Sequence, residues 1–247
     1  MSNTDPILAK VRKLLAKAED QAATPEEAEL YNAKAAQLIS DYGIDQAMLS
    51  ASAPGTDRLG DRVLTMDAPY AMDKAELLAD VAAGLRCRAV LRTRGGPQKE
   101  ISVHLFGHES DLVRTDLLFT SLLLQAAVGL ARTPVPPSEH KAAFRRSWLA
   151  GFRLAIIRRL RETEARAEAA AEERYAGGST ALVLADRSQQ VAAALRTAYP
   201  GASTARPRSL SGSGHGHGYA EGQRADLGGT GGSSLRGYRA ASLERRT

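Results

Sequence analysis

Two histidines and a glutamate lie close together near the middle of the chain, where they could support metal or hydrolytic chemistry. His104 and His108 are four residues apart, and Glu109 follows directly. In zinc proteases this spacing places two ligands on one face of a helix. Here the residues before Gly107 alternate as in a strand, and the glutamate follows the second histidine rather than the first. The pattern therefore predicts no metal site, and a hydrolase built around these three residues stays an alternative.

A second pair, His215 and His217, lies in a glycine-rich stretch. Short histidine tracts bind transition metals adventitiously, but two ligands in a flexible segment do not predict a physiological site. The single cysteine, Cys87, excludes an internal disulfide and a cysteine-built metal centre. Burial statistics favour a small buried thiol over a reactive nucleophile.

Motifs for nucleophilic or phosphate chemistry are absent from the sequence. There is no Gly-x-Ser-x-Gly elbow, no Gly-x-x-x-x-Gly-Lys-Ser/Thr loop and no dinucleotide-type Gly-x-Gly-x-x-Gly loop after a strand. Carboxylates are spread over helix faces without a pair that the sequence places in one cleft. We therefore expect a non-enzymatic protein with no cofactor and no catalytic residues.

Arginines provide the positive pattern. Alternate residues of a strand share a face, so a strand from 86 to 93 with the residue that follows it places four cations on one side: Arg86, Arg88, Arg92 and Arg94. Cys87, Ala89 and Leu91 would then face the core. This pattern fits either a cationic sheet face that meets phosphates or an ordinary solvated face.

A second cationic surface is predicted on the helix that begins near Lys141. Its apolar stripe includes Phe144, Trp148, Phe152 and Ile156, and its opposite side carries Arg146, Arg153, Arg158 and Arg161. Such a helix could lie along a DNA backbone, an acidic partner or an anionic membrane surface, or it could be a core helix with solvated arginines. The formal net charge is +5. Arginine abundance alone is weak evidence, because a GC-rich genome produces it, but the uneven distribution of charge along the chain is harder to explain by codon bias.

The N-terminal region must form a helical hairpin. Pro6 suits the first position of a helix in which apolar residues recur at helical spacing from Ile7 to Ala18. The second helix opens with Thr24-Pro25-Glu26-Glu27, a capping box with proline at the first helical position. Gly43 is the expected stop of this helix.

These two helices resemble a bacterial and phage family, domain of unknown function 2786. The resemblance rests on the run from Ile7 to Glu19, on Glu27-Ala28-Glu29, and on Ala36 to Ile39 leading into Tyr42-Gly43-Ile44-Asp45 and Met48-Leu49. The stretch from Phe106-Gly107 to Ser110-Asp111-Leu112-Val113 is similar to a module that often follows this hairpin. The resemblance implies a helical hairpin and carries no catalytic residues.

Patterning divides the chain into five regions. Residues 1–50 form the helical hairpin, 51–61 a linker, and 62–132 a small α+β unit in the order β-α-β-β-α, with a turn at 94–98 between the last two strands. Residues 138–199 form long C-terminal helices, the first lasting to Tyr175, and 200–247 form a flexible, basic tail rich in glycine and serine. The expected fold is α+β, mostly helical, with a small antiparallel sheet.

The sequence favours a binding protein associated with DNA or RNA through its arginine-rich surfaces. Counter-ion release would supply the affinity, and the 5% aromatic content leaves little for base readout. An adaptor that binds another protein through the helical hairpin is a further alternative. No apolar run reaches the ~20 residues of a membrane span and no signal pattern begins the chain, so we expect a cytoplasmic protein that binds no membrane. The sequence does not indicate the oligomeric state.

Overall fold

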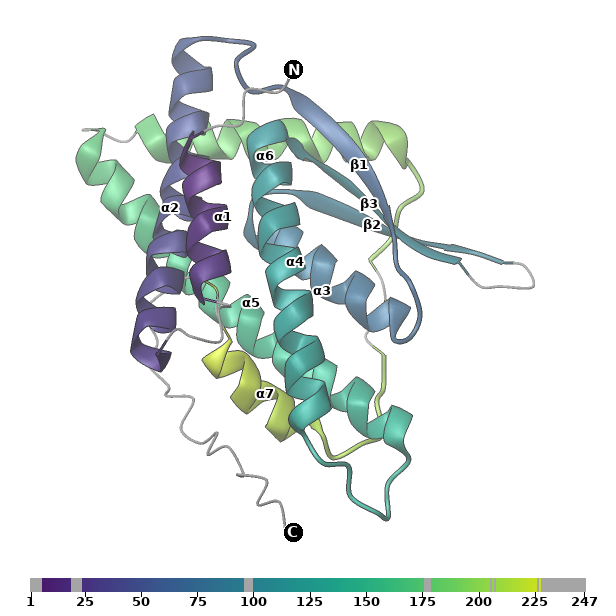
Figure 1. Ribbon diagram of the computed structural model, residues 1–247. Coiled ribbons are helices and arrows are strands. Elements are labelled where there is room, and N and C mark those ends of the chain that lie inside the picture. The colour runs from purple at the N-terminus through teal and green to yellow at the C-terminus, as the bar shows by residue number, and fades with distance from the viewer. Residues whose placement is uncertain are drawn as a thin grey trace.

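The computed structural model describes residues 6–18, 24–95, 100–175, 179–204, 206, 208–225 and 227. Within these ranges the protein has seven helices and one three-stranded sheet, which confirms the predicted α+β, mostly helical class. Figure 1 shows the hairpin helices on one side of the molecule and the sheet on the other, with α4 between them.

The N-terminal hairpin consists of α1 (Pro6–Ala18) and α2 (Pro25–Ser52). The predicted capping box is present: the Thr24 hydroxyl accepts from the Glu27 N–H, and the Glu27 carboxylate accepts from the Thr24 N–H. Val11 and Leu15 pack against Ala35 and Ile39. The helix does not stop at Gly43 as predicted but continues for nine more residues, because the second half of α2 is buried against the body of the protein.

The sheet has the order β1-β3-β2, with β1 spanning Leu59–Thr65, β2 spanning Arg88–Arg94 and β3 spanning Glu100–His108. Both pairings are antiparallel, with Val63 and Val90 each opposite His104. The central strand β3 is buried along most of its length, whereas β1 and β2 are edge strands with exposed residues. Residues 96–98 of the predicted turn at 94–98 lie outside the described residues, as does residue 99.

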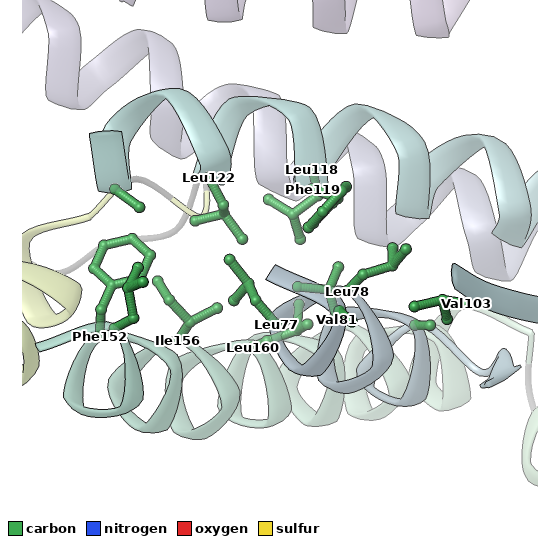
Figure 2. Close-up of a cluster of buried hydrophobic side chains, with 14 of the residues drawn as sticks. Leu77, Leu78, Val81, Val103, Leu118, Phe119, Leu122, Phe152, Ile156 and Leu160 are labelled. Carbon is green, nitrogen blue, oxygen red and sulfur yellow. The ribbon is translucent and has the colours of Figure 1, made fainter. Parts of the chain in front are cut away.

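Three helices build the main core against the inner face of the sheet: α3 (Ala71–Gly84), α4 (Glu109–Arg132) and α5 (Lys141–Arg174). Their apolar side chains meet in one cluster, in which Figure 2 shows α3 between α4 and α5. Leu78 and Val81 of α3 and Leu122 of α4 are at most 1% exposed. Trp148 of α5 is fully buried, and its indole N–H donates to Thr133 Oγ1 at 3.1 Å.

The second half of α5 packs against the hairpin. The sequence after Glu162 is rich in alanine and glutamate and has few large apolar side chains, yet Ala167 and Ala171 are buried against Ile44 of α2. Asp45 accepts hydrogen bonds from Arg174 and Tyr175. Small side chains allow the two helices to approach closely. Hydrophobic periodicity alone does not reveal such an interface.

The segment after Pro200 corrects the prediction of an entirely flexible tail. Helix α6 (Ser179–Ala198) ends before Pro200. Beyond Pro200, residues His215–Arg224 form the helix α7, which packs along α5. Gly214, Gly218 and Gly222 repeat every four residues and therefore share one face of α7. Added Cβ atoms at these three positions would lie 1.8–2.6 Å from carbonyl oxygens of α5, so only glycine permits this contact. Residues 228–247 of the predicted tail lie outside the described residues.

In the part of the chain that the structure describes, α4 alone is long and apolar enough to cross a membrane by length and composition. Half of its most apolar window is buried inside the protein, which is also typical of the core helix of a soluble protein.

Candidate nucleic-acid interface

The candidate interface is the sheet face that points away from α3 and α4, which we call the outer face. The β2–β3 register places Arg88 opposite Phe106, Arg92 opposite Ser102 and Arg94 opposite Glu100. Because directly opposite residues of an antiparallel pair share a face, the three arginines lie on one side of β2. Val90 interrupts the row, as the alternation predicts.

Arg88, Arg92 and Arg94 are exposed. Within the described residues none of their side chains forms a hydrogen bond or an ion pair, although Glu100 lies across the strand from Arg94. Figure 1 shows the β2–β3 hairpin extending beyond the helices, so the end that carries Arg92 and Arg94 projects from the body. The row therefore presents charge that no carboxylate of the described chain neutralises.

Arg86 does not belong to this row. It precedes β2 in a left-handed conformation with φ of 66°, and its side chain is only 9% exposed. The guanidinium lies 2.9 Å from carboxylate oxygens of both Glu164 and Glu168 on α5. The prediction that Arg86 shares the strand face is thus wrong, because the chain turns sharply between α3 and β2 and these carboxylates attract the cation inward.

Helix α6 covers the other end of the outer face. The Tyr199 hydroxyl lies 2.8 Å from His104 Nδ1, and Asp61 Oδ2 lies 2.8 Å from His104 Nε2. The Tyr199 ring also meets Phe106 edge-on. The part of β3 near His104 and Phe106 is therefore covered by the protein itself. Arg92 and Arg94 lie toward the uncovered end, and Arg88 is exposed on the edge strand beside the covered part.

Within the described residues, two of the predicted arginines of α5 form ion pairs with acidic residues, unlike the arginines of β2. Arg153 pairs with Glu76 and Asp80 of α3. Arg158 pairs with Glu162 one turn along the same helix. The remaining two, Arg146 and Arg161, are exposed. The helix surface thus keeps less unpaired charge than β2.

A buried ionic network joins the sheet, α2, α4, α5 and α6. Arg114 of α4 is fully buried and donates to Asp111 at 2.8 Å and to Glu164 of α5 at 2.6 Å. Ser40 of α2 donates to the same Glu164 oxygen at 2.8 Å. An added Cβ on Gly43 would lie 2.0 Å from Arg114 Nη1, so this glycine makes room for the guanidinium. Gly43 thus serves close approach rather than helix termination.

The second half of the network is centred on Asp57, which precedes β1. Its carboxylate accepts from the Ser110 N–H at 3.0 Å and from the Ser110 hydroxyl at 2.6 Å, and so satisfies the start of α4. The first turn of α4 is thus satisfied by a residue that is distant in the sequence. Arg187 of α6 bonds Asp57 at 2.6 Å and Asp111 at 3.2 Å.

Charges in the network are balanced, since the arginines at 86, 114 and 187 face the carboxylates at 57, 111 and 164. Removing one partner of such a buried set leaves an uncompensated charge. The network therefore fixes the relative positions of the elements that carry the outer face. Sequence reasoning missed this network because most of its contacts join residues 50 to 130 positions apart, with the i, i+3 pair of Asp111 and Arg114 as the exception.

The residues of the hydrolase alternative bind different partners. His104 is held by Asp61 and Tyr199, and Glu109 pairs with Arg62. His108 is buried at the turn into α4, where its Nδ1 lies 3.3 Å from the Asp57 carbonyl oxygen, and burial lowers its pKa. Ser110 donates to Asp57. The described chain thus shows no Ser–His hydrogen bond of the kind that activates a nucleophile.

Metal and thiol chemistry find equally little support. The described residues include no group of three or more histidine, cysteine or acidic side chains that could hold a metal ion. Cys87 is buried as predicted, with its sulfur 3.7 Å from Thr115 Oγ1. Burial raises the pKa of this thiol to about 12, so at neutral pH it is protonated and a poor nucleophile.

Comparison with known families identifies the hairpin. A family model described as "Protein of unknown function (DUF2786)" matches residues 7–46, about one sixth of the chain, and this is the family that the sequence resembles. The matched segment ends within the stretch of α2 that carries Gly43, Ile44 and Asp45, the residues that contact the body. No curated protein and no solved structure matches the chain.

Proposed function

We propose that this is a non-enzymatic binding protein that holds DNA or RNA by its phosphate backbone, through Arg88, Arg92 and Arg94 on the outer face of β2. The observation that carries the proposal is the exposure of three arginines in one row without an acidic partner among the described residues. Neighbouring phosphates of a nucleic acid provide the matching row of negative charges.

The spacing of the row suits a repeating anion. Strand residues two apart on one face are separated by about 6.8 Å, so Arg92 and Arg94 lie one such step apart and Arg88 lies about 13.6 Å from Arg92. Guanidinium groups bind phosphate oxygens in a bidentate manner. Contacts of this kind position a nucleic acid and do not read its bases, which agrees with the scarcity of aromatic residues.

The buried network supports the proposal indirectly. A row of arginines can bind a phosphate backbone tightly only if the strand beneath it is rigid, because ordering a mobile segment costs conformational entropy. The network ties the start of β1 and the end of β3 to α4, α5 and α6, and the core fixes the inner face of the sheet.

Two triple variants with equal charge changes test the proposal. One replaces Arg88, Arg92 and Arg94 by glutamine, and the other replaces Arg146, Arg158 and Arg161 of α5. Fluorescence anisotropy with a labelled duplex and a labelled single strand at low salt should show an affinity loss of roughly tenfold or more for the β2 variant. The α5 variant should stay near the parent.

Equal losses of affinity in the two variants would show that binding depends on the net charge of the protein and not on the arginine row. A larger loss in the α5 variant would move the interface to that helix. If the parent protein bound neither probe at low salt, the nucleic-acid proposal would be wrong.

A further inference from the structure

A groove of about 550 Å³ lies between the N-terminal hairpin and α4. Helix α1 contributes Arg12, Leu15 and Ala16 to its walls, and α4 contributes Val113, Leu117 and Leu124. Leu117 of α4 packs in part against the hairpin here, whereas Leu124 stays 51% exposed. The groove is separate from the arginine row of β2.

The floor of the groove continues as an apolar stripe along α4. The stripe lies on one face of α4, opposite the face that packs into the core. It consists of Val113, Leu117, Leu124 and Val128. Leu124 is 51% exposed and Val128 is 40% exposed. Large apolar side chains that remain exposed beside a groove mark an interaction site more often than scattered surface residues do.

The wall formed by α1 contributes one cation, Arg12, which is exposed and forms no ion pair with the described residues. The lysines of α1 lie outside the groove lining, and Lys17 lies over the Tyr31 ring of α2. The acidic residue inside the groove, Asp116, is already paired with Arg62. The groove therefore combines an apolar floor with one exposed cation, Arg12, that has no acidic partner among the described residues.

We propose that this groove binds an acidic amphipathic α-helix of a partner protein. Apolar side chains of the ligand at positions i, i+3 or i+4, and i+7 would cover Leu124, Val128 and the part of Leu117 that the hairpin leaves free, and carboxylates on its flank would face Arg12. The stripe from Val113 to Val128 is about 22 Å long, the length of a helix of about 15 residues. Phosphate alone would leave the apolar floor exposed, so charge complementarity and the floor together select an acidic helix over a nucleic acid.

The test is a selection from a displayed library of random 16-residue peptides on the full-length protein. Enriched peptides should carry net negative charge and apolar residues at helical spacing. Synthesised with a fluorophore, the consensus peptide should bind the parent and lose at least tenfold in affinity to the Leu124→Asp, Val128→Asp double variant and to Arg12→Glu.

Matched controls separate the groove from general surface effects. Leu182 on α6 is 74% exposed and lies outside the groove lining, so Leu182→Asp should bind the peptide as the parent does. Lys34→Glu on α2 makes the same charge change as Arg12→Glu at an exposed site outside the lining, and it should also bind normally. Circular dichroism confirms that each variant is folded.

Several results would overturn the proposal. The selection could enrich no peptide, or it could enrich basic peptides or peptides without helical periodicity. The control variants could also lose as much peptide affinity as the groove variants. Two further assays use a 20-base-pair duplex and vesicles of phosphatidylglycerol, and ultracentrifugation follows self-association. If the groove variants abolished one of these interactions while peptide affinity stayed unchanged, a nucleic acid, a membrane or a second copy would be the occupant instead.

Discussion

Replacement of Gly218 by alanine should release α7 from α5, whereas the same replacement at Gly216 should stabilise the protein. Both residues lie in α7, but only Gly218 faces α5. An added Cβ at Gly218 would lie 1.8 Å from the carbonyl oxygen of Trp148, whereas nothing lies within 4 Å of a Cβ at Gly216. The obstacle is backbone, so no side chain can rotate away to relieve the clash.

The structure sets the size of the effect. An ordinary contact begins near 3.4 Å, so α7 must withdraw by more than 1.5 Å at Gly218, which also opens the contacts of Gly214 and Gly222. Overpacking of this kind costs about 1–3 kcal/mol. Alanine in place of an unobstructed helical glycine gains about 0.5–1 kcal/mol. The two variants should therefore differ by about 1.5–4 kcal/mol in their free energy of unfolding.

Urea unfolding followed by fluorescence measures this difference directly, because Trp148 is the only tryptophan and lies beneath α7. Hydrogen exchange should show faster exchange of the α7 amides in Gly218→Ala alone. If Gly218→Ala is as stable as Gly216→Ala and its α7 amides stay protected, α7 does not dock on α5 through its glycines.

Three further outcomes follow from the buried groups. Gly43→Ala should lower the free energy of unfolding by about 3–5 kcal/mol, because the added Cβ displaces the buried guanidinium of Arg114 and breaks its ion pairs. Gly60→Ala is the control, since the only close contact there is the end of a flexible glutamate side chain. Equal losses of stability for the two variants in urea unfolding would contradict the reasoning. Cys87, whose pKa burial raises to about 12, should react with a disulfide reagent at least about tenfold more slowly in the native protein than in urea, and equal rates would show an accessible thiol. Burial lowers the pKa of His108, so below about pH 6.5 the unfolded chain binds a proton that the folded protein does not, and stability should decline as the pH falls through that range. The decline should be smaller in His108→Gln, and parallel profiles for the two proteins would exclude this histidine as its source.

Local signals in the sequence predicted the elements that hold the candidate site. The capping box at Thr24 marks the start of α2, and the alternation around Arg88 and Arg92 marks β2 and its exposed face. Such signals work because hydrogen-bond capping and side-chain alternation depend on neighbours within a few residues.

Contacts between distant segments could not be predicted in the same way. Gly43 has the type and position of a helix stop, but the guanidinium of Arg114 requires it inside the helix. Arg86 has the parity of the strand face, yet Glu164 and Glu168 attract it inward. The glycines at 214, 218 and 222 form a four-residue repeat in the sequence. This repeat indicates a docking face only once a helix is known to form there.

The salt dependence of binding tests the central claim most directly. The logarithm of the association constant for a duplex should fall linearly with the logarithm of the salt concentration, with a slope of about 0.9 per phosphate contact. Replacing Arg88, Arg92 and Arg94 by glutamine should reduce the magnitude of that slope by about 2.7. Replacing Arg146, Arg158 and Arg161 should leave it unchanged. If the parent and the β2 variant show the same slope, the arginine row makes no phosphate contacts and the proposed interface is wrong.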